Sequence, residues 1–475
     1  MRLEMLSRDE IETIHVKSLE ILEKIGILIP HEEIKSLFEN VGATVNFNTG
    51  IVKIPPHLVN ELISKAGKKF TIYGRDLSKK AEFGAGKRNY NTSFGQAHWL
   101  DSLGGDRRQP NLKDIEKAVK LADYLEQITI PGAMADPIEI PLKWRCLAVA
   151  FEMVKNTTKP IGFWFHDKSS ARYLNDFFAV LRGGEESAKK YPLCYPLFEP
   201  VSPLSFPFNG IDLLFETCKL NLPVQVGPMA QMGVSAPATI AGTIAIENAE
   251  ILAAICITQL IQEGTPICYG GICHAFDMKT AQIIFGGPEQ VILSIAMSQM
   301  GKNYGFPVYI NTGLTDSKTL DAQAGLESGI TLGTSSLTDA DVYGHMGICG
   351  MDQAASLDML IMQSEIISYI ESIHREVSFK DEAFALDIIR EAGPKGSFLN
   401  KHHTRNNIRN QLWFPSLLDR YGYEKWIKKG AMDMKKRCQM LKEKILIEHI
   451  PEPLEKDIKL DLEKLIEKAK KELSI

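Results

Sequence analysis

Residues able to do chemistry recur along this chain at the ends of short runs rich in β-branched and aromatic side chains. The polar candidates for binding or catalysis are Asn91, Gln96, His166, Glu199, Asp316 and His345. The aromatic candidates are Tyr90, Phe94, Phe165, Phe198 and Tyr343. Aromatic faces hold an organic cation that has no N–H donors, and each face contributes about 0.5–2 kcal/mol. The polar set also leaves a hydrolase or lyase open, in which His345, His166 and a carboxylate would move protons.

Eight such runs qualify as the strands that position these residues. They span residues 89–96, 128–134, 160–166, 193–199, 223–229, 266–272, 307–312 and 341–346. Their starts lie about 30 to about 43 residues apart, which is the length of one strand, one helix and two loops. Eight units of this kind predict a (β/α)8 barrel, also called a TIM barrel, in which chemistry occurs at the C-terminal ends of the strands.

The pattern divides the chain into three regions. Residues 1–85 predict an N-terminal α/β cap, because a helical stretch is followed by VNFNTGIVKIPP, which resembles a hairpin. Residues 86–420 form the predicted barrel, and within them 237–263 predict one long apolar helix that should be strongly buried. Residues 421–475 become rich in Lys and Glu, which predicts a C-terminal helical extension on the surface.

Composition narrows the class of protein. The chain has 475 residues, and its formal net charge of −5 without a concentrated basic stripe argues against nucleic acid as a partner. The sequence has no run of about 18 apolar residues, so we expect no membrane partner. The charged start MRLEMLSRDEIETIH lacks the apolar core of a signal peptide, which predicts a cytoplasmic protein. Eight cysteines without paired CxxC motifs predict reduced, buried thiols and no metal site.

Glycine-rich loops follow several of the predicted strands and would gather at one rim of the barrel. They span residues 227–237, 269–280, 285–289 and 311–325. Glycine lets a large ligand or a partner approach the backbone closely. The loops therefore predict a wide mouth that admits something bulky and planar, although they also suit an ordinary strand-to-helix connection.

The same loops carry a resemblance. Three long stretches are QMGVSAPATIAGTIAIENAEILAAICITQLIQEGTPICYGG, DMKTAQIIFGGPEQVILSIAMSQM and NTGLTDSKTLDAQAGLES. Shorter stretches upstream are HVKSLEILEKIGI, YGRD and DSLGGDRRQPNLKDI. In order and spacing these stretches resemble the trimethylamine methyltransferase family. The resemblance implies a (β/α)8 barrel that moves a methyl group from a methylated amine to the Co(I) of a corrinoid. It also implies that this corrinoid, cob(I)alamin, is supplied by a cognate corrinoid protein that docks at the barrel mouth, and that this chain binds none tightly.

One position points to a branch of that family. Trimethylamine-specific members carry pyrrolysine just before the part of the motif that matches TDSK, and this chain has Leu314 there. The chain therefore resembles the non-pyrrolysine branch, which demethylates quaternary amines such as glycine betaine, proline betaine and carnitine. A quaternary ammonium already carries the charge that makes the departing amine a competent leaving group. The protein then needs mainly to orient one N-methyl group and to exclude water.

The resemblance also assigns roles to residues. Tyr90, Asn91, Phe94 and Tyr343 match pocket positions of that branch, where aromatic rings would hold the ammonium. His345 is the expected catalytic residue: it would contact a betaine carboxylate or the corrinoid, or give a proton to the departing amine. The remaining expected substrate-binding residues are Gln96, Phe165, His166, Phe198, Glu199, Leu314 and Asp316. The last of these could instead brace its loop.

Two other functions remain open from the sequence. One is the hydrolase or lyase acting on a small cationic substrate. The other is a non-catalytic protein that binds betaine. A large barrel with added terminal helices commonly self-associates, so we also expect a homo-oligomer.

Overall fold

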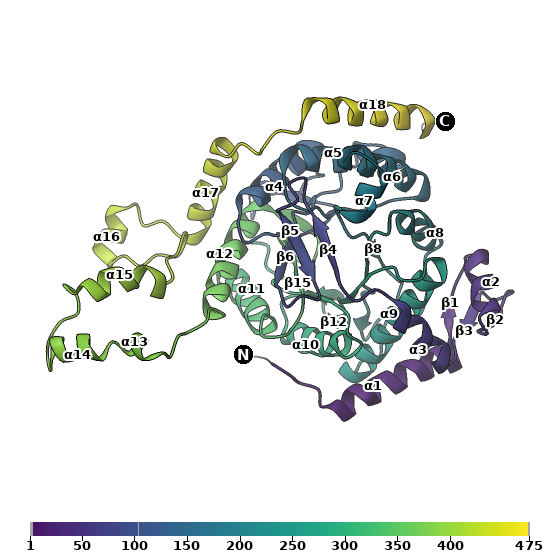
Figure 1. The fold of residues 1–475 in the computed structure, drawn as a ribbon, viewed down its shortest axis with the longest axis horizontal. Helices are drawn as coiled ribbons and strands as arrows, with labels where there is room; N and C mark the ends of the chain where they lie inside the picture. Colours follow the sequence, from purple (N-terminus) through teal and green to yellow (C-terminus); the bar gives the residue numbers. More distant parts are fainter. Residues whose placement is uncertain (1–2, 103, 474–475) are drawn as a thin grey trace.

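The computed structural model describes residues 3–102 and 104–473 and shows a mixed α/β fold, in which helices surround a parallel sheet (Figure 1). Six of the eight predicted runs contain a strand of this sheet. The strands are β6 (Asn89–Thr92), β8 (Leu197–Phe198), β9 (Val224–Val226), β11 (Ile267–Gly271), β14 (Val308–Asn311) and β15 (Val342–Met346). They pair in the order β6-β15-β14-β11-β9-β8, and every pairing is parallel.

The second and third predicted runs, 128–134 and 160–166, form no extended strand, contrary to the prediction. They nevertheless lie beside the sheet. Single β-bridges join the first run to the second and the second to the third. A backbone hydrogen bond of 3.1 Å joins the third run to the fourth. Pro131 and Pro160 lie within these runs and lack the N–H that a longer ladder needs.

Helices follow the strands and cover the outer face of the sheet. They are α4 (Leu112–Tyr124), α5 (Leu142–Asn156), α6 (Lys168–Arg182), α7 (Glu185–Lys190), α8 (Phe208–Thr217), the 3-10 turn η2 (Cys218–Leu220), α9 (Ile240–Ile261), α10 (Pro288–Asn303), α11 (Ala322–Ser335) and α12 (Leu357–Ile373). Asp167, Thr239 and Asp321 begin three of them as N-caps, because each side chain accepts a hydrogen bond from a backbone N–H of the first turn.

Helix α9 corresponds to the long apolar helix predicted at 237–263, and its burial is confirmed. It is long and apolar enough to cross a membrane by length and composition, yet 78% of its apolar window is buried inside the fold. Its two acidic side chains are buried as well. Glu247 accepts two backbone N–H groups at 3.1 Å each, and Glu250 accepts hydrogen bonds from loop 202–204. The helix therefore braces the loops at the C-terminal edge of the sheet.

The N-terminal region contains a small antiparallel sheet and three helices that pack against the body. The elements are α1 (Arg8–Glu20), the π-turn η1 (Ile21–Ile25), β1 (Ile27–Leu28), α2 (Glu32–Asn40), β2 (Thr44–Asn46), β3 (Ile51–Lys53) and α3 (Pro56–Lys65). The predicted hairpin is confirmed, because β2 and β3 pair antiparallel with Asn46 opposite Ile51. Helices α1 and α3 contact α9.

A second hairpin covers the end of the sheet where the strands begin. It consists of β4 (Phe70–Tyr73) and β5 (Lys80–Phe83), and in Figure 1 it lies at the centre of the ring of helices. The backbone N–H of Gly84 donates to Asp341, the residue before β15, at 2.7 Å. Ile72 and Phe83 belong to the apolar cluster on the inner face of the sheet.

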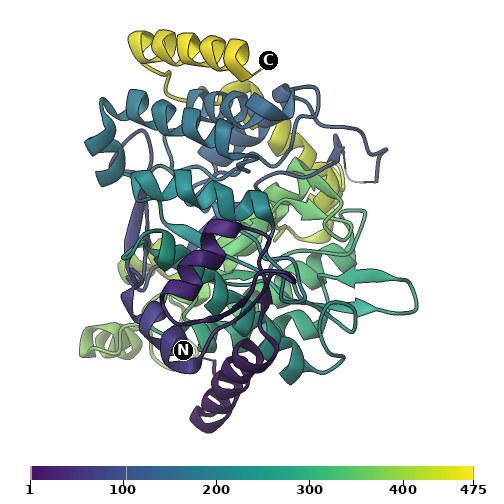
Figure 2. The ribbon, with the colours of Figure 1, turned by 90° about the vertical axis from the view of Figure 1, so that its right-hand side faces the viewer.

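Two small sheets flank the opposite end, which we call the mouth. One has the order β10 (Gln231–Met232), β12 (His274–Asp277), β13 (Gln282–Ile284). The other has the order β16 (Ile348–Cys349), β17 (Ala354–Ser356), β7 (Trp99–Leu100). Figure 2 shows the 274–284 hairpin projecting to the right.

The chain leaves the ring of helices at Ile373, ahead of residue 421, where the sequence predicts the extension to begin. The next helices project away from the body in Figure 1. They are α13 (Asp381–Phe384), α14 (Leu386–Ala392), α15 (His402–Gln411) and α16 (Tyr423–Lys428). The chain then returns, since α17 (Met434–Glu448) contacts α12 and α4, and α18 (Lys456–Leu473) contacts α5 and α6.

Candidate active site at the mouth

Aromatic rings line the inner face of the parallel sheet below the mouth. Phe94, Tyr195 and Tyr309 are buried and belong to one apolar cluster, against which Trp164 packs. The Phe94 ring lies 5.9 Å from Tyr195 and 6.2 Å from Trp164, edge-on in both cases. Such contacts contribute about 0.5–1.5 kcal/mol each beyond burial. Phe94 is therefore the centre of an aromatic wall.

His345, near the C-terminal end of β15, packs against the same wall. Its ring lies 5.1 Å from Phe94 and 5.2 Å from Tyr309, whose hydroxyl is 3.1 Å from Nδ1. The backbone N–H of His345 donates to Asn311 Oδ1 at 3.2 Å. Burial lowers the pKa of His345 to about 3, so the imidazole is neutral at pH 7. A neutral imidazole can orient a ligand through a hydrogen bond, and it carries no additional proton to give at that pH.

Some polar side chains on the inner face have no hydrogen-bond partner. Asn91 and Gln225 are 0% exposed, and within the described chain neither amide makes a hydrogen bond. The buried Tyr195 hydroxyl is also unpaired. Gln225 pairs in register with Leu197, which lines the mouth cavity, so both point to the same face. Leaving such groups unpaired costs about 1–3 kcal/mol each, which favours a place where a ligand or water binds.

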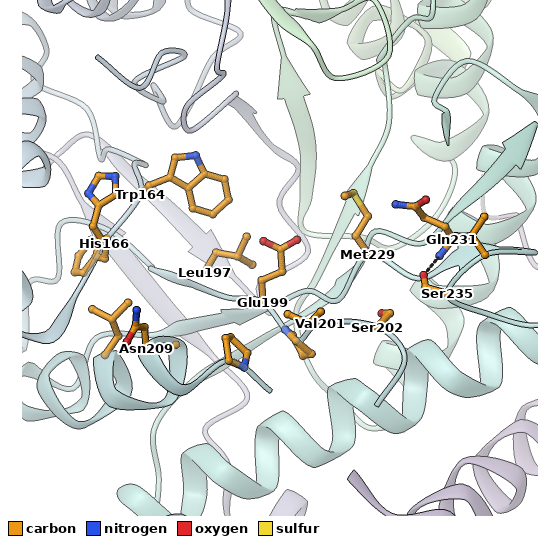
Figure 3. Close-up of a pocket in the computed structure, with 16 residues that line it drawn as sticks. Trp164, His166, Leu197, Glu199, Val201, Ser202, Asn209, Met229, Gln231 and Ser235 are labelled. Atoms are coloured by element: carbon orange, nitrogen blue, oxygen red, sulfur yellow. Dashed lines mark hydrogen bonds between the residues drawn. The ribbon is translucent and has the colours of Figure 1, made fainter. Parts of the chain in front are cut away.

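A cavity of about 580 Å³ opens where β8 and β9 end (Figure 3). Its lining includes Trp164, Phe165, His166, Leu197, Glu199 and Met229. Figure 3 shows the Glu199 carboxylate pointing into the space between Trp164 and Met229. Of the residues that the structure describes, no Lys or Arg lines the cavity. The cavity is thus a negatively charged recess beside the aromatic wall.

A second carboxylate stands near Glu199. Burial, and then the charge of Asp352, raise the pKa of Glu199 to about 7. Burial also raises the pKa of Asp352 to about 6, although Gln96 Nε2 donates to Asp352 Oδ1 at 2.6 Å. Gln96 is in turn held by the Ser93 hydroxyl at 2.7 Å. Gln96 therefore positions Asp352, and its amide is already engaged.

His166 is oriented at the edge of the cavity by an ion pair behind it. Its Nε2 lies 3.5 Å from Asp136 Oδ1, and Arg145 Nη1 lies 2.6 Å from Asp136 Oδ2. Burial would raise the pKa of Asp136, but the hydrogen bonds and charges of His166 and Arg145 lower it overall. The Nδ1 atom of His166 has no hydrogen-bond partner in the described residues.

Three of the predicted binding rings lie in the helix layer instead. The Tyr90 hydroxyl donates to Glu371 of α12 at 2.6 Å, and the Tyr343 hydroxyl donates to a backbone carbonyl at 3.2 Å. The buried Phe198 ring packs on another phenylalanine at 5.7 Å. Side chains alternate along a strand, so these rings point outward where their neighbours point inward. Their contacts place all three rings away from the aromatic wall.

Two further predicted residues serve the seventh loop. Both oxygens of Asp316 accept backbone N–H groups, from Phe285 at 3.0 Å and from Gly286 at 3.1 Å. Leu314 is 1% exposed and packs in a small apolar cluster with Phe285 and Ile348. Asp316 thus holds its loop in place, which was the alternative to substrate binding. Leu314 packs in the apolar core of the same region.

The sequence interpretation missed Tyr195, Gln225, Tyr309 and Asp352. Side chains alternate between the two faces of a strand, so Tyr309 in the predicted strand 307–312 faces the opposite way to Val308 and Ile310. Those two residues pack between the sheet and the helices, and this pattern could have revealed Tyr309. The same rule could have revealed Gln225 in β9. Asp352 lies in a loop and reaches the site only through the fold, so no local signal marks it.

Comparisons with known proteins identify the family. The family model for trimethylamine methyltransferase (MTTB) matches residues 1–474. The glycine betaine methyltransferase of Desulfitobacterium hafniense is 30% identical over 471 residues, covering 99% of this chain and 98% of its own length. The trimethylamine methyltransferase MttB of Methanosarcina barkeri is 28% identical over 484 residues, with 99% and 96% covered.

Among solved structures, the monomethylamine methyltransferase MtmB of Methanosarcina barkeri aligns with a TM-score of 0.46 and 10% identity, over 99% of this chain and 95% of its own. The family match spans nearly the whole chain, and a relative at 30% identity does so too. The chain therefore belongs to the trimethylamine methyltransferase (MTTB) family and is a methyltransferase.

Proposed function

We propose that this protein transfers an N-methyl group from a quaternary amine of the betaine type to the Co(I) of a corrinoid carried by a separate cognate protein. Membership in the MTTB family supports methyl transfer, and the similarity to a glycine betaine methyltransferase supports a quaternary amine. The observation that carries the proposal is the pairing of an aromatic wall with a recess that is lined by the Glu199 carboxylate and, among the described residues, by no Lys or Arg.

The chain binds and orients the substrate. The faces of Phe94 and Trp164 attract the methyl groups of the ammonium, which carry its positive charge. Leu314 is packed away in its apolar cluster, so the chain presents no reactive group from that position. The neutral His345 imidazole and the Tyr309 hydroxyl are the polar groups of the wall and hold the polar end of the substrate.

The reaction needs little acid–base chemistry from the protein. The N–CH₃ bond breaks, and its electron pair stays on nitrogen, so the product is a neutral tertiary amine. The corrinoid supplies the nucleophile that accepts the methyl group. Burial around the wall excludes water and fixes one methyl group in line for attack, which is the main part of catalysis here.

The partner and the complete fold follow from the same proposal. We propose that runs 128–134 and 160–166 complete a (β/α)8 barrel, since bridges and a hydrogen bond already link them to both edges of the sheet. The two small sheets at the mouth would then frame an opening for the corrinoid protein. The glycine-rich loops at this end let a planar group approach the backbone.

The test is spectral. Purified protein is mixed with cob(I)alamin under reducing conditions and with glycine betaine, proline betaine or carnitine, and the absorbance of methylcob(III)alamin is followed. The proposal expects amine-dependent methylation, which Tyr90→Phe retains because that ring lies outside the site. A hydrolytic product formed without cob(I)alamin would favour the hydrolase or lyase. Tight binding of every amine with no methylation would favour a binding protein.

A further inference from the structure

The mouth cavity contains a carboxylate that the fold leaves without a partner. Glu199 lines the cavity and points between Trp164 and Met229 (Figure 3). Nowhere in residues 3–102 and 104–473 does a side chain or backbone group form a hydrogen bond or an ion pair with this carboxylate. A half-buried carboxylate without a donor is costly unless a cation arrives.

Asp352 adds a second negative charge close to Glu199, although it does not line the cavity itself. Its charge acts on Glu199, and Gln96 holds it there through a hydrogen bond of 2.6 Å. Asp352 and Met351 both adopt the left-handed backbone region, with φ of 61° and 60°. Asp tolerates that region better than most residues, whereas Met351 is strained there, so the turn that presents Asp352 is held by its surroundings.

Buried polar groups beneath the cavity are an independent observation. Tyr195 lies two residues before Leu197 in the same run, and Gln225 is in register with Leu197, so all three share one face. The Tyr195 hydroxyl and the Gln225 amide are at least nine-tenths buried, and no partner is found for them in the described chain. These groups lie on the same face of the sheet as the cavity, and unpaired polar groups there favour a polar or charged occupant.

We propose that Glu199 and Asp352 form a subsite that binds a trimethylammonium group, with Trp164 and Phe94 as its aromatic side. This subsite prefers a ligand of net positive charge. The identity of the ligand rests on the proposed function. A quaternary ammonium has no N–H, so it needs a non-directional contact, which an unpartnered carboxylate provides. Two carboxylates attract such a cation more strongly than one aromatic face does. A metal ion would need more ligands, and the described residues contain no group of three or more His, Cys, Asp or Glu suited to one.

The experiment compares a cation with its neutral isostere. Choline and 3,3-dimethylbutan-1-ol have the same shape, and binding of each to the purified full chain is measured calorimetrically at about pH 8.5, where both carboxylates are ionised. Wild-type protein should bind choline at least about tenfold more tightly than the neutral alcohol. Glu199→Gln and Asp352→Asn should each remove most of this preference while changing the affinity for the alcohol less than about twofold. Glu116→Gln, which removes a charge from the exposed face of α4, should behave as wild type.

Two results separate this subsite from the proposed function. If both carboxylate variants keep the full preference for choline, the subsite is wrong, whether or not the wild-type protein methylates cob(I)alamin. If the preference depends on Glu199 and Asp352 but no amine is demethylated, the subsite stands and the proposed function fails. Thermal unfolding of each variant shows that a lost preference does not come from a lost fold.

Residues 374–433, here called the arm, contain helices without a core of their own. Helices α13, α14, α15 and α16 have no buried residue among those described. They are between 4 and 10 residues long, and isolated helices shorter than about 12–15 residues are marginal in water. The arm therefore needs a surface to pack on beyond the one that this chain offers it.

Many large apolar side chains of the arm are exposed. Those more than a third exposed are Val377, Phe379, Phe384, Leu386, Ile389, Phe398, Leu399, Ile408, Leu412, Phe414, Leu418, Tyr421, Tyr423 and Ile427. Summed over the arm, these side chains expose roughly 1,000 Å² or more of apolar surface. A stable interface buries about 800 Å² on each partner, so the arm exposes enough apolar surface to form one.

Charge and position indicate which partner covers the arm. The arm carries 11 Lys and Arg against 8 Asp and Glu, whereas the whole chain carries 54 against 59, so the arm is basic and the rest is acidic. In Figure 2 the green segment around 380–395 projects to the left, opposite the 274–284 hairpin of the mouth. A protein docked at the mouth would therefore not cover it. The rest of a second copy carries the opposite net charge, and its α11 exposes Leu326 and Ile330.

We infer that the arm packs on a second copy of this chain and makes the protein a homo-oligomer. Sedimentation velocity at micromolar concentration should show the wild-type chain as a dimer or larger. The double variant Phe379→Glu and Leu399→Glu should sediment as a monomer, because both side chains are exposed in one chain, at 77% and 92%. Ile447→Glu on α17, which is 79% exposed outside the arm, should leave the assembly intact. A monomeric wild type, or an oligomer that survives the double variant, would overturn this inference.

Discussion

Replacing Phe94 separates its part in packing from its part in binding. Phe94 is 2% exposed and contacts the rings of Trp164, Tyr195 and His345. Phe94→Ala would leave a cavity and cost about 3–5 kcal/mol of the free energy of unfolding. Phe94→Leu keeps most of the volume, so its cost should stay below about 1.5 kcal/mol, while it still removes one π face.

The loss of that face sets the expected effect on binding. One π face is worth about 0.5–2 kcal/mol, so the dissociation constant for a quaternary amine should rise about 2- to 30-fold in Phe94→Leu. Tyr343→Leu is the matched control, because Tyr343 is equally buried but lies in the helix layer. It should lose stability and leave the dissociation constant unchanged. Calorimetric titration with glycine betaine and thermal unfolding measure both quantities on each protein. Equal effects of the two variants on binding would refute the placement of these rings.

Three further predictions concern the scaffold. Burial raises the pKa of Glu250 to about 7 in the folded state, whereas the unfolded state loses this proton near pH 4.5. The contribution of this group to stability is therefore fully present below pH 4.5 and is lost as pH rises towards 7. Glu250→Gln should therefore weaken the fall of Tm between about pH 5 and pH 8, and an unchanged slope would contradict this. At Gly132 an added Cβ would lie 2.1 Å from a backbone oxygen of Ser93, so Gly132→Ala should greatly lower Tm or abolish soluble expression. At Gly325 in α11 an added Cβ would have no atom within 4 Å, so Gly325→Ala should raise the free energy of unfolding by about 0.4–1 kcal/mol. The Asn side chain of Asp316→Asn can accept only one of the two backbone N–H groups that Asp316 now binds. The amide protons at 285–286 should therefore exchange faster with solvent, while the affinity for a quaternary amine stays within about twofold of the wild-type value.

The sequence predicted the repeating elements well where local pattern decides them. Runs such as 307–312 have the β-branched and aromatic composition of a strand, and six of eight formed one. The two that did not contain Pro131 and Pro160, each of which removes one backbone donor, but a proline also begins 307–312, so proline alone does not decide the outcome. Strand composition alone could not assign a ring to a face, so Tyr90 and Tyr343 were expected in the pocket although they lie in the helix layer.

Residues that depend on tertiary contacts were beyond a local pattern. Asp352 reaches Glu199 from a loop more than 150 residues away in sequence, and only the hydrogen bond from Gln96 shows that it belongs to the site. The low pKa of His345 likewise comes from burial that no motif encodes. The exposed arm was expected to belong partly to the barrel and partly to a surface helix, because its short helices have no distinctive period.

The proposed reaction transfers an intact methyl group from nitrogen to cobalt. An isotope experiment follows that group when the protein and cob(I)alamin are supplied with glycine betaine or choline labelled with ¹³C in the N-methyl groups. We expect ¹³C-labelled methylcob(III)alamin by NMR and an equal amount of the corresponding tertiary amine from at least one of them. Label that stays entirely in the quaternary amine, or that appears in a hydrolytic product with cob(I)alamin unchanged, would contradict it.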